Sequence, residues 1–243
     1  MKPPIGLNRQ EAATLAATEN ERFARLAGLL GPGDWGKQTE CPAWDVRAMS
    51  AHVLGMMEFG ASLREFAHVL RAGPRAARGR PVIDGITEVQ VAERAHLSEQ
   101  EVTDGLARLA PVSARSRMRR AALLGGLPTK QEYEGRMETW PLGYLMAVIL
   151  TRDTWMHRVD VCRAVGADLV LTPEHDGRLV ADVVAEWAFR HGEPYRLTLL
   201  GPAGGHFVSG EAGEEITVDA VEFCRILSGR ATGAGLLGRP VPF

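Results

Sequence analysis

The chain has 243 residues, of which 45% are hydrophobic and 24% are charged, a composition typical of a folded protein with one large domain or two modest ones. Its formal net charge of -2 provides no general attraction for nucleic acid or for an anionic membrane. The longest apolar run, at 144–150, is far shorter than the roughly 20 residues that cross a bilayer, and the polar N-terminal segment lacks the apolar core of a signal peptide. Three widely spaced cysteines, Cys41, Cys162 and Cys224, indicate reduced thiols, so we expect a cytoplasmic protein.

Helical periodicity dominates the first part of the chain. Apolar residues recur every three or four positions from Asn8 to Leu30, which predicts an amphipathic helix that ends at Gly31. Asp45 is placed to cap a second helix that runs to about Leu70. Residues 71–84 are rich in Gly, Pro and Arg, so we expect an exposed connection there.

The helical pattern then returns twice. It covers about Thr87 to Leu109 and Pro111 to Leu124, and the polar residues 128–137 follow. A fourth long helix fits Pro141 to Val165, with Gly166 as its C-terminal glycine. Four main helices joined by loops predict an up-and-down bundle.

The pattern changes after Asp168, where alternating apolar residues and glycine-rich turns become frequent. The predicted elements are a helix at 173–191, short strands at 196–200, 206–209 and 215–218, and a last helix at 219–227. We therefore predict an α+β fold, with a four-helix bundle in residues 1–168 and a smaller α+β C-terminal domain in residues 169–243.

Candidate metal ligands lie in the second and fourth of these helices. Asp153 and His157 are four positions apart, so their side chains lie on one helix face and can share a divalent cation. A catalytic zinc needs a third protein ligand and an open position. His52 lies among apolar residues of the second helix and is expected to point into the bundle, which makes it the best third ligand. Asp160, one turn beyond His157, could orient that imidazole or bind water.

The same residues also have simpler interpretations. An Asp/His pair at this spacing is commonly a hydrogen bond on a helix surface, and a buried histidine such as His52 is commonly a core residue with its hydrogen bonds satisfied. The basic run from Arg115 to Arg120 is expected to be a solvated helix face, because no aromatic side chains lie within it to stack on bases. Cys41, which has no neighbouring cysteine, is expected to be a small buried apolar residue.

Several motifs of the chain resemble the mycothiol-dependent maleylpyruvate isomerase family, whose N-terminal part is a DinB-like metal-binding bundle. The similarity covers nearly the whole chain, including its small C-terminal domain. It is carried by DW at 34–35, CPAWDVR at 41–47, AHVLG at 51–55, RDTWMHRVD at 152–160, SGR at 228–230 and PVPF at 240–243.

The resemblance implies a thiol-dependent metalloenzyme. His52, Asp153 and His157 occupy the positions of the metal ligands, zinc is the first candidate for the ion, and the best-characterised members carry Glu where this chain has Asp153. Mycothiol, a thiol of actinobacteria, is the implied cosubstrate, and this source agrees with 25 arginines against 3 lysines. A metal-held thiolate could attack an electrophile in S-transfer or drive cis-trans isomerisation of a maleylpyruvate-like substrate. The alternative is a non-catalytic DinB-like module that binds a ligand or a metal.

Further site residues follow from the resemblance and from position in the sequence. Arg230 is the expected catalytic cation for an anionic substrate, and Arg158, next to His157, is a second choice for binding the cofactor. A solvated surface position is the simpler interpretation of both. Trp44 and Trp155 could wall the cofactor site or pack in the core. The expected partners are a small-molecule thiol and an electrophile, with neither nucleic acid nor membrane, and no oligomeric state is indicated.

Overall fold

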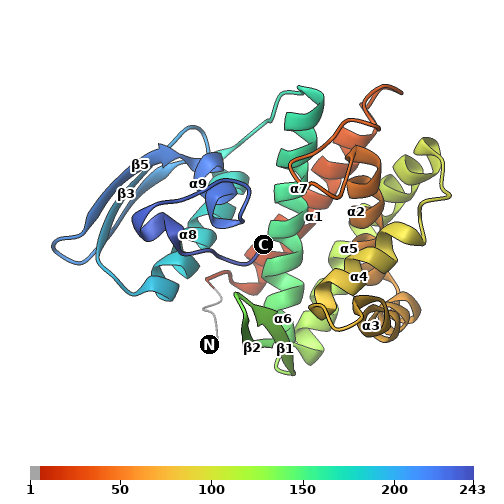
Figure 1. Cartoon of the computed structure of the whole chain (residues 1–243), viewed down its shortest axis with the longest axis horizontal. Helices are drawn as coiled ribbons and strands as arrows, with labels where there is room; N and C mark the ends of the chain where they lie inside the picture. Colours follow the sequence, from red (N-terminus) through yellow and green to blue (C-terminus); the bar gives the residue numbers. More distant parts are fainter. Residues whose placement is uncertain (1–5) are drawn as a thin grey trace. The chain divides into compact units, whose positions relative to one another are not determined.

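A computed structural model describes residues 6–243. The chain divides into two compact units, of which the first comprises Arg9–Asp168, whereas residues 6–8 join Leu169–Phe243 in the second. The first unit is helical with one β-hairpin, and the second combines helices with a three-stranded sheet (Figure 1), so the prediction of an α+β fold is confirmed. Within residues 6–243, no helix has the length and apolar character needed to span a membrane.

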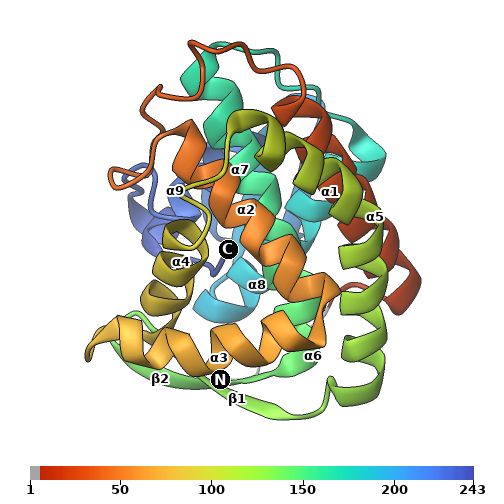
Figure 2. The same ribbon diagram turned by 90° about the vertical axis from the view of Figure 1, so that its right-hand side faces the viewer.

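Four helices form the predicted bundle of the first unit: α1 (Arg9–Ala27), α2 (Val46–Ala61), α5 (Glu99–Leu124) and α7 (Leu150–Val165). Both α5 and α7 pack against α1 and against α2, which closes the bundle (Figures 1 and 2). All four helices contribute to its apolar core, which includes Phe23, Leu54, Leu106 and Val161. Burying each such side chain contributes about 1.5–3 kcal/mol, so the bundle is the stable frame that positions the site.

The predicted second helix is in fact two helices. The prediction that Asp45 caps α2 is confirmed, because its Oδ1 accepts a hydrogen bond from the Ala48 N–H at 2.7 Å. However, α2 ends before Ser62, whose extended backbone (φ -114°, ψ 129°) interrupts the helix. The Ser62 Oγ then accepts from the Glu65 N–H at 3.3 Å and caps α3 (Leu63–Ala77). Figure 2 shows the resulting turn between α2 and α3.

The prediction of an exposed connection at 71–84 is wrong. Helix α3 continues through Gly73 and Pro74, and α4 (Val82–Ala92) begins soon afterwards. A Cβ at Gly85 would lie 2.0 Å from the Gly73 carbonyl oxygen, so the two helices approach each other at backbone distance. The glycines that predicted a loop therefore permit close helix packing.

Helix α5 is continuous through Pro111, whereas the sequence predicted two helices divided at that proline. The real start of the helix is a capping box at Ser98. The Ser98 backbone N–H donates to Glu101 Oε2 at 2.8 Å, and the Glu101 N–H donates to Ser98 Oγ at 3.2 Å. The break between helices therefore lies at 93–98.

The polar residues before the fourth helix form a β-hairpin. Strands β1 (Pro128–Tyr133) and β2 (Arg136–Pro141) are antiparallel, with Pro128 opposite Pro141. Glu134 and Gly135 both have positive φ, 52° and 69°, as a tight two-residue hairpin turn requires.

The fourth predicted helix is not uniform. It begins with α6 (Leu142–Tyr144), continues through a π-helical turn, η1 (Leu145–Ile149), and becomes α7, which ends at Gly166 as predicted (φ 73°). Turns of this wider type occur frequently near functional sites, and here the π-turn directly precedes the residues Asp153 and His157.

The second unit combines a small sheet with helices. Its elements are η2 (Pro173–Gly177), α8 (Arg178–His191), β3 (Tyr195–Leu200), β4 (Gly205–Ser209), β5 (Glu214–Asp219), α9 (Ala220–Leu227) and the 3-10 turn η3 (Gly235–Gly238). The strand order is β4-β3-β5, with β3 antiparallel to β4 and parallel to β5. Trp187 of α8 packs 4.8 Å from the Tyr195 ring and 5.5 Å from the Phe223 ring, which joins the helices to the sheet.

Candidate metal centre

His52 lies inside the bundle, as expected from its apolar neighbours. It belongs to α2, and only 2% of its surface is exposed. A buried imidazole needs polar partners, because an unpaired polar group in the interior is costly. The partner of its Nε2 atom is Asp153 of α7, whose Oδ2 lies 3.3 Å away.

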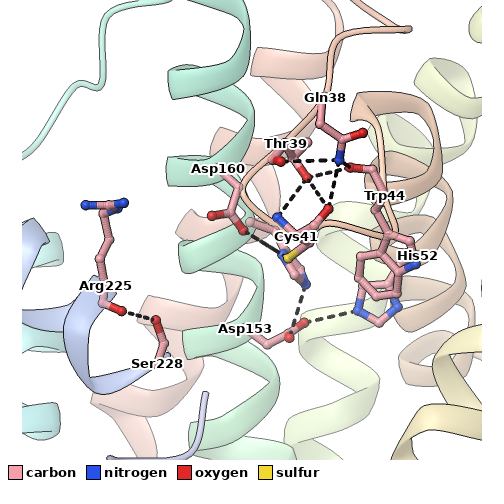
Figure 3. A network of polar contacts seen from close by, with 10 residues as sticks. Gln38, Thr39, Cys41, Trp44, His52, Asp153, Asp160, Arg225 and Ser228 are labelled. Carbon is pink, nitrogen blue, oxygen red and sulfur yellow. Dashed lines mark hydrogen bonds and ion pairs between the residues drawn. The ribbon is translucent and has the colours of Figure 1, made fainter. Parts of the chain in front are cut away.

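Asp153 lies between two histidines. Its Oδ2 faces His52 Nε2, and its Oδ1 lies 3.2 Å from His157 Nε2, one helical turn further along α7. Figure 3 shows the Asp153 carboxylate with a contact on each side. The Asp153 side chain keeps 22% of its surface exposed, so the centre is accessible from outside. The structure thus brings together the three residues that the sequence singled out.

The geometry of this group fits a divalent cation. One ligand atom from each of the three residues lies within 4.8 Å of the others. Nitrogen and oxygen ligands at 2.0–2.2 Å from a tetrahedral zinc ion lie about 3.4 Å from one another. The contacts of 3.2 Å and 3.3 Å, which join the two different oxygens of Asp153 to the two imidazoles, are close to that separation. Two imidazoles and one carboxylate are also a donor set that zinc accepts.

The charges of the three side chains depend on one another. Burial raises the pKa of Asp153, but the charge of His157 and hydrogen bonds from both imidazoles outweigh burial and hold that pKa well below 3.8. Burial lowers the pKa of His157, but Asp153 and Asp160 outweigh burial and raise that pKa to about 9. Burial lowers the pKa of His52 despite the opposing effect of Asp153. At neutral pH the ion-free centre therefore holds a carboxylate, a protonated His157 and a neutral His52.

Asp160 holds the far side of the His157 ring. Its carboxylate is fully buried, and its Oδ2 lies 3.1 Å from His157 Nδ1. A proton kept on Nδ1 by this contact leaves Nε2 to face Asp153. The same Oδ2 lies 4.0 Å from the Sγ of Cys41. Cys41 is half-buried rather than fully buried, so the expectation of a simple core residue is corrected.

The loop before α2 is fixed by its own hydrogen bonds. Gln38 Nε2 donates to the carbonyl oxygens of Cys41 at 3.0 Å and Trp44 at 2.9 Å, and Thr39 Oγ1 donates to the same Trp44 oxygen at 2.6 Å (Figure 3). As a result, the Trp44 ring lies 4.8 Å from the His52 ring and 5.8 Å from the His157 ring. Trp44 therefore covers one side of the centre.

Gln90 of α4 is a neighbour of His52 that the sequence did not single out. His52 Nδ1 and Gln90 Oε1 are both buried and have no hydrogen-bond partner among residues 6–243. Gln90 nevertheless raises the pKa of His52, which is the effect of an amide oxygen facing a ring N–H. The approach is possible because α2 has Gly55 here, where a Cβ would lie 2.8 Å from Gln90 Cβ. The sequence feature that could have identified Gln90 is its position as a polar residue among the apolar residues of α4.

Three other predicted site residues have different surroundings. Arg158 forms a buried ion pair with Glu19 of α1, with Nε 2.6 Å from Oε1, so the structure favours a structural role over cofactor binding. Trp155 is buried, and it lies two residues from Asp153, which places it on the opposite side of α7. Arg230 follows α9 in the second unit, whereas the centre described above is built from the first.

Comparisons with known proteins agree with this architecture. The family model described as the mycothiol maleylpyruvate isomerase N-terminal domain matches residues 16–162. The chain is similar to a crystal structure of the mycothiol-dependent maleylpyruvate isomerase, with a TM-score of 0.55, 18% sequence identity and coverage of 93% of this chain and 91% of that one. A histidine-to-alanine mutant of such an isomerase gives a TM-score of 0.54, 16% identity and the same coverage.

The likeness to these solved structures shows a shared fold. A search of curated proteins finds no match. The family model spans more than half of the chain, including every residue named above at the centre. The chain therefore belongs to the mycothiol maleylpyruvate isomerase N-terminal domain family.

Proposed function

We propose that this protein is a mycothiol-dependent metalloenzyme that activates a thiol for S-transfer to an electrophile or for cis-trans isomerisation of a maleylpyruvate-like substrate. Membership of the family supports the thiol and the class of reaction. The single observation that carries the metal is the position of Asp153, whose two oxygens each face a histidine Nε2 atom.

In this proposal, His52, Asp153 and His157 hold the divalent cation, and zinc suits the two nitrogens and one oxygen that they offer. A cation held by three protein ligands keeps one position open, and when bound it lowers the pKa of a thiol so that the nucleophilic thiolate exists near neutral pH. The shorter side chain of Asp153, compared with Glu, is compatible with the ligand spacing, because α2 and α7 pack directly against each other.

Residues around the centre orient its ligands and shield them from water. Asp160 keeps a proton on His157 Nδ1 and so directs Nε2 toward the centre. Trp44 shields one side of both imidazoles from water, which strengthens the electrostatic interactions within the centre. We propose, on the resemblance to the family alone, that Arg230 is the cation that binds a carboxylate of the substrate.

The two reactions differ in the fate of the thiol. In isomerisation, the sulfur adds to one carbon of an activated cis alkene, the resulting single bond rotates, and elimination restores the alkene as the trans isomer and releases the thiol. In S-transfer, the sulfur adds to the activated alkene, whose π bond breaks, the neighbouring carbon takes up a proton, and the C–S bond remains, so that one thiol is consumed for each product. The thiol balance therefore separates the two reactions.

Metal analysis of the purified protein tests the centre. We expect about one zinc per chain in the wild type and loss of most of it in His52→Ala and His157→Ala, because each variant removes one of three ligands. His68→Ala is the matched control, since His68 lies on α3 with 46% of its side chain exposed. Equal zinc content in all four proteins would overturn the proposed metal centre.

A turnover assay tests whether the protein is an enzyme. We expect the zinc-loaded protein to isomerise maleylpyruvate with mycothiol at constant thiol concentration, or to consume mycothiol with an electrophile. Saturable binding of mycothiol without product would instead identify a non-catalytic module of the same fold.

A further inference from the structure

The basic run on α5 is not the solvated face that its sequence predicts. Arg115 and Arg119 are exposed, but Arg117 and Arg120 are buried. Arg117 donates to the Thr151 hydroxyl of α7, and Arg120 donates to carbonyl oxygens in the last turn of α2. This part of the run therefore joins helices of the bundle.

A second group of metal-ligating side chains lies on the other side of the His157 ring. Cys41, Asp160 and His157 each offer one ligand atom, and these atoms lie within 4.8 Å of one another. Asp160 Oδ2 lies 3.1 Å from His157 Nδ1 and 4.0 Å from Cys41 Sγ. The group shares His157 with the candidate metal centre but uses the opposite nitrogen, because His157 faces Asp153 through Nε2.

The separations within this second group are close to those around a metal ion with a thiolate ligand. Sulfur at about 2.3 Å and nitrogen or oxygen at about 2.1 Å from a tetrahedral ion lie about 3.6 Å apart. Binding would therefore require the sulfur to approach Asp160 Oδ2 from 4.0 Å to about 3.6 Å. A small rotation of the Cys41 side chain is enough for that shift.

The charges of the second group suit a divalent cation that prefers sulfur. A Cys41 thiolate and the Asp160 carboxylate together balance two positive charges, and a neutral His157 adds a third ligand. Asp160 has no exposed surface, and a buried charge is costly unless it is compensated. The thiolate makes this ligand set softer than the two nitrogens and one oxygen of the metal centre, so it favours a thiophilic ion such as cadmium.

The loop before α2 holds Cys41 in place and leaves it accessible. The Cys41 N–H donates to Thr39 Oγ1 at 3.2 Å, and the Cys41 carbonyl oxygen accepts from Gln38 Nε2 at 3.0 Å. Figure 3 shows the Cys41 sulfur between this loop and Asp160. Cys41 is half-buried, whereas Asp160 and His157 are buried, so an ion would reach the group from the Cys41 side.

His157 can serve only one of the two positions at a time. A neutral imidazole binds a cation through one nitrogen and keeps a proton on the other. A cation bound at Nδ1 therefore requires a proton at Nε2, which faces Asp153. The metal centre then has two ligands, His52 and Asp153, instead of three.

We propose that Cys41, Asp160 and Nδ1 of His157 form a binding site for a thiophilic divalent cation, and that its occupation releases the ion held by the metal centre. The Cys41 proton passes to solvent, and the proton that leaves Nδ1 is matched by one taken up at Nε2. The release of the ion rests on the proposed function, whereas the thiophilic site itself does not.

The experiment titrates the zinc-loaded protein with cadmium. Ultraviolet absorption of the cadmium–thiolate bond reports binding by cysteine, and metal analysis counts zinc and cadmium per chain. Nitrogen NMR of the histidine side chains reports which ring nitrogen binds the ion. Wild type is compared with Cys41→Ser, with His52→Ala and with Cys162→Ser, the matched control, which removes a buried thiol of the same unit.

We expect cadmium to produce thiolate absorption in wild type and to release about one zinc for each cadmium bound. Cys41→Ser should lack the absorption and should need at least about 10-fold more cadmium to lose its zinc. Cys162→Ser should match wild type, and His52→Ala should keep the absorption, because it lacks a ligand of the metal centre only. NMR of wild type should place cadmium on Nδ1 of His157, which tests the site even if Cys41→Ser does not fold.

Other outcomes would overturn the proposal. No thiolate absorption in wild type, or equal absorption in Cys41→Ser, would show that Cys41 holds no cation. Absorption that depends on Cys41 while all zinc is retained would show that the two positions do not compete for His157. By contrast, Cys41-dependent absorption in a wild type that neither contains nor takes up zinc would support the thiophilic site and overturn the proposed metal centre alone.

Discussion

Asp160 determines how the His157 ring is oriented in the candidate metal centre. The Asp160 carboxylate is completely buried, so its negative charge must be stabilised by close partners such as the His157 Nδ1 atom at 3.1 Å. An anionic partner at Nδ1 makes the opposite nitrogen a stronger ligand, because it stabilises positive charge on the ring. The identity of residue 160 should therefore affect zinc affinity without any contact with the ion.

We expect Asp160→Asn to weaken zinc binding about 10- to 100-fold, since it removes this charge but keeps an oxygen that can accept from Nδ1. It should also lower the pKa of His157 in the ion-free protein, which Asp160 helps to raise to about 9. Competition with a chelator measures the affinity, and an NMR titration follows the histidine. Asp104→Asn on exposed α5 surface is the control, and equal zinc affinity in both variants would contradict the role of Asp160.

The proposed ligands were predictable because a helix fixes which of its own residues share a face. Asp153, His157 and Asp160 follow from a spacing of three or four, and His52 follows from its apolar neighbours. Gln90 did not stand out, because it comes from α4. Whether its side chain meets the centre depends on how α4 packs on α2, and no periodicity within one helix encodes that contact.

At the scale of elements, α1 and α7 are joined by a buried ion pair. Glu19 has no exposed surface, and its Oε1 and Oε2 lie 2.6 Å and 3.3 Å from the Nε and Nη2 of Arg158. Arg158 projects from a different side of α7 than Asp153 and His157 do, because successive residues are about 100° apart around a helix. The ion pair therefore holds in place the helix that carries those two residues. Its contribution to stability depends on both partners, because removing either one weakens the compensation of a charge that stays buried.

Glu19→Gln should therefore destabilise the protein by about 3–5 kcal/mol, which is the usual effect of breaking a buried pair from one side. Glu21→Gln, on the exposed side of the same helix, should change stability by less than about 0.5 kcal/mol. Urea unfolding of both variants measures the difference. Similar unfolding free energies would show that Arg158 does not depend on Glu19.

Element boundaries were less predictable than element types. Ser62 and Ser98 start helices through hydrogen bonds to Glu65 and Glu101, and these caps are short local signals within long apolar patterns. The glycines of α3 and α4 look like a loop in the sequence, but they allow the two helices to touch. A glycine signals both chain reversal and close approach, and tertiary packing decides between them.

At the scale of the whole molecule, the fold class followed from one change in periodicity. The helical pattern before Asp168 and the short alternating runs after it correspond to the helical first unit and to the sheet of the second. The strands were easily located because glycine-rich turns separate them. Their pairing in the order β4-β3-β5 required the structure, since local patterns do not specify which strands become neighbours.

The coupled charges of the centre predict how the stability of the ion-free protein depends on pH. The pKa of His157 is raised from 6.5 to about 9, so its contribution is fully present below pH 6.5 and is lost as the pH rises through 9. The pKa of Asp153 is depressed below 3.8, so its contribution is present above that pH and is lost in acid. The contribution of these two groups should therefore be highest between pH 3.8 and 6.5, whereas the lowered pKa of His52 makes its contribution fall as the pH drops below 6.5.

Bound zinc should abolish the loss of stability at alkaline pH. Bound zinc replaces the proton on His157, so zinc binding below pH 9 should release about one proton and strengthen with rising pH. We expect the unfolding free energy of chelator-treated protein to fall between pH 6.5 and 9, and that of zinc-loaded protein to be maintained or to rise. His157→Gln, which lacks the titrating group, should show neither trend. Identical profiles with and without zinc in the wild type would mean that no cation replaces this proton.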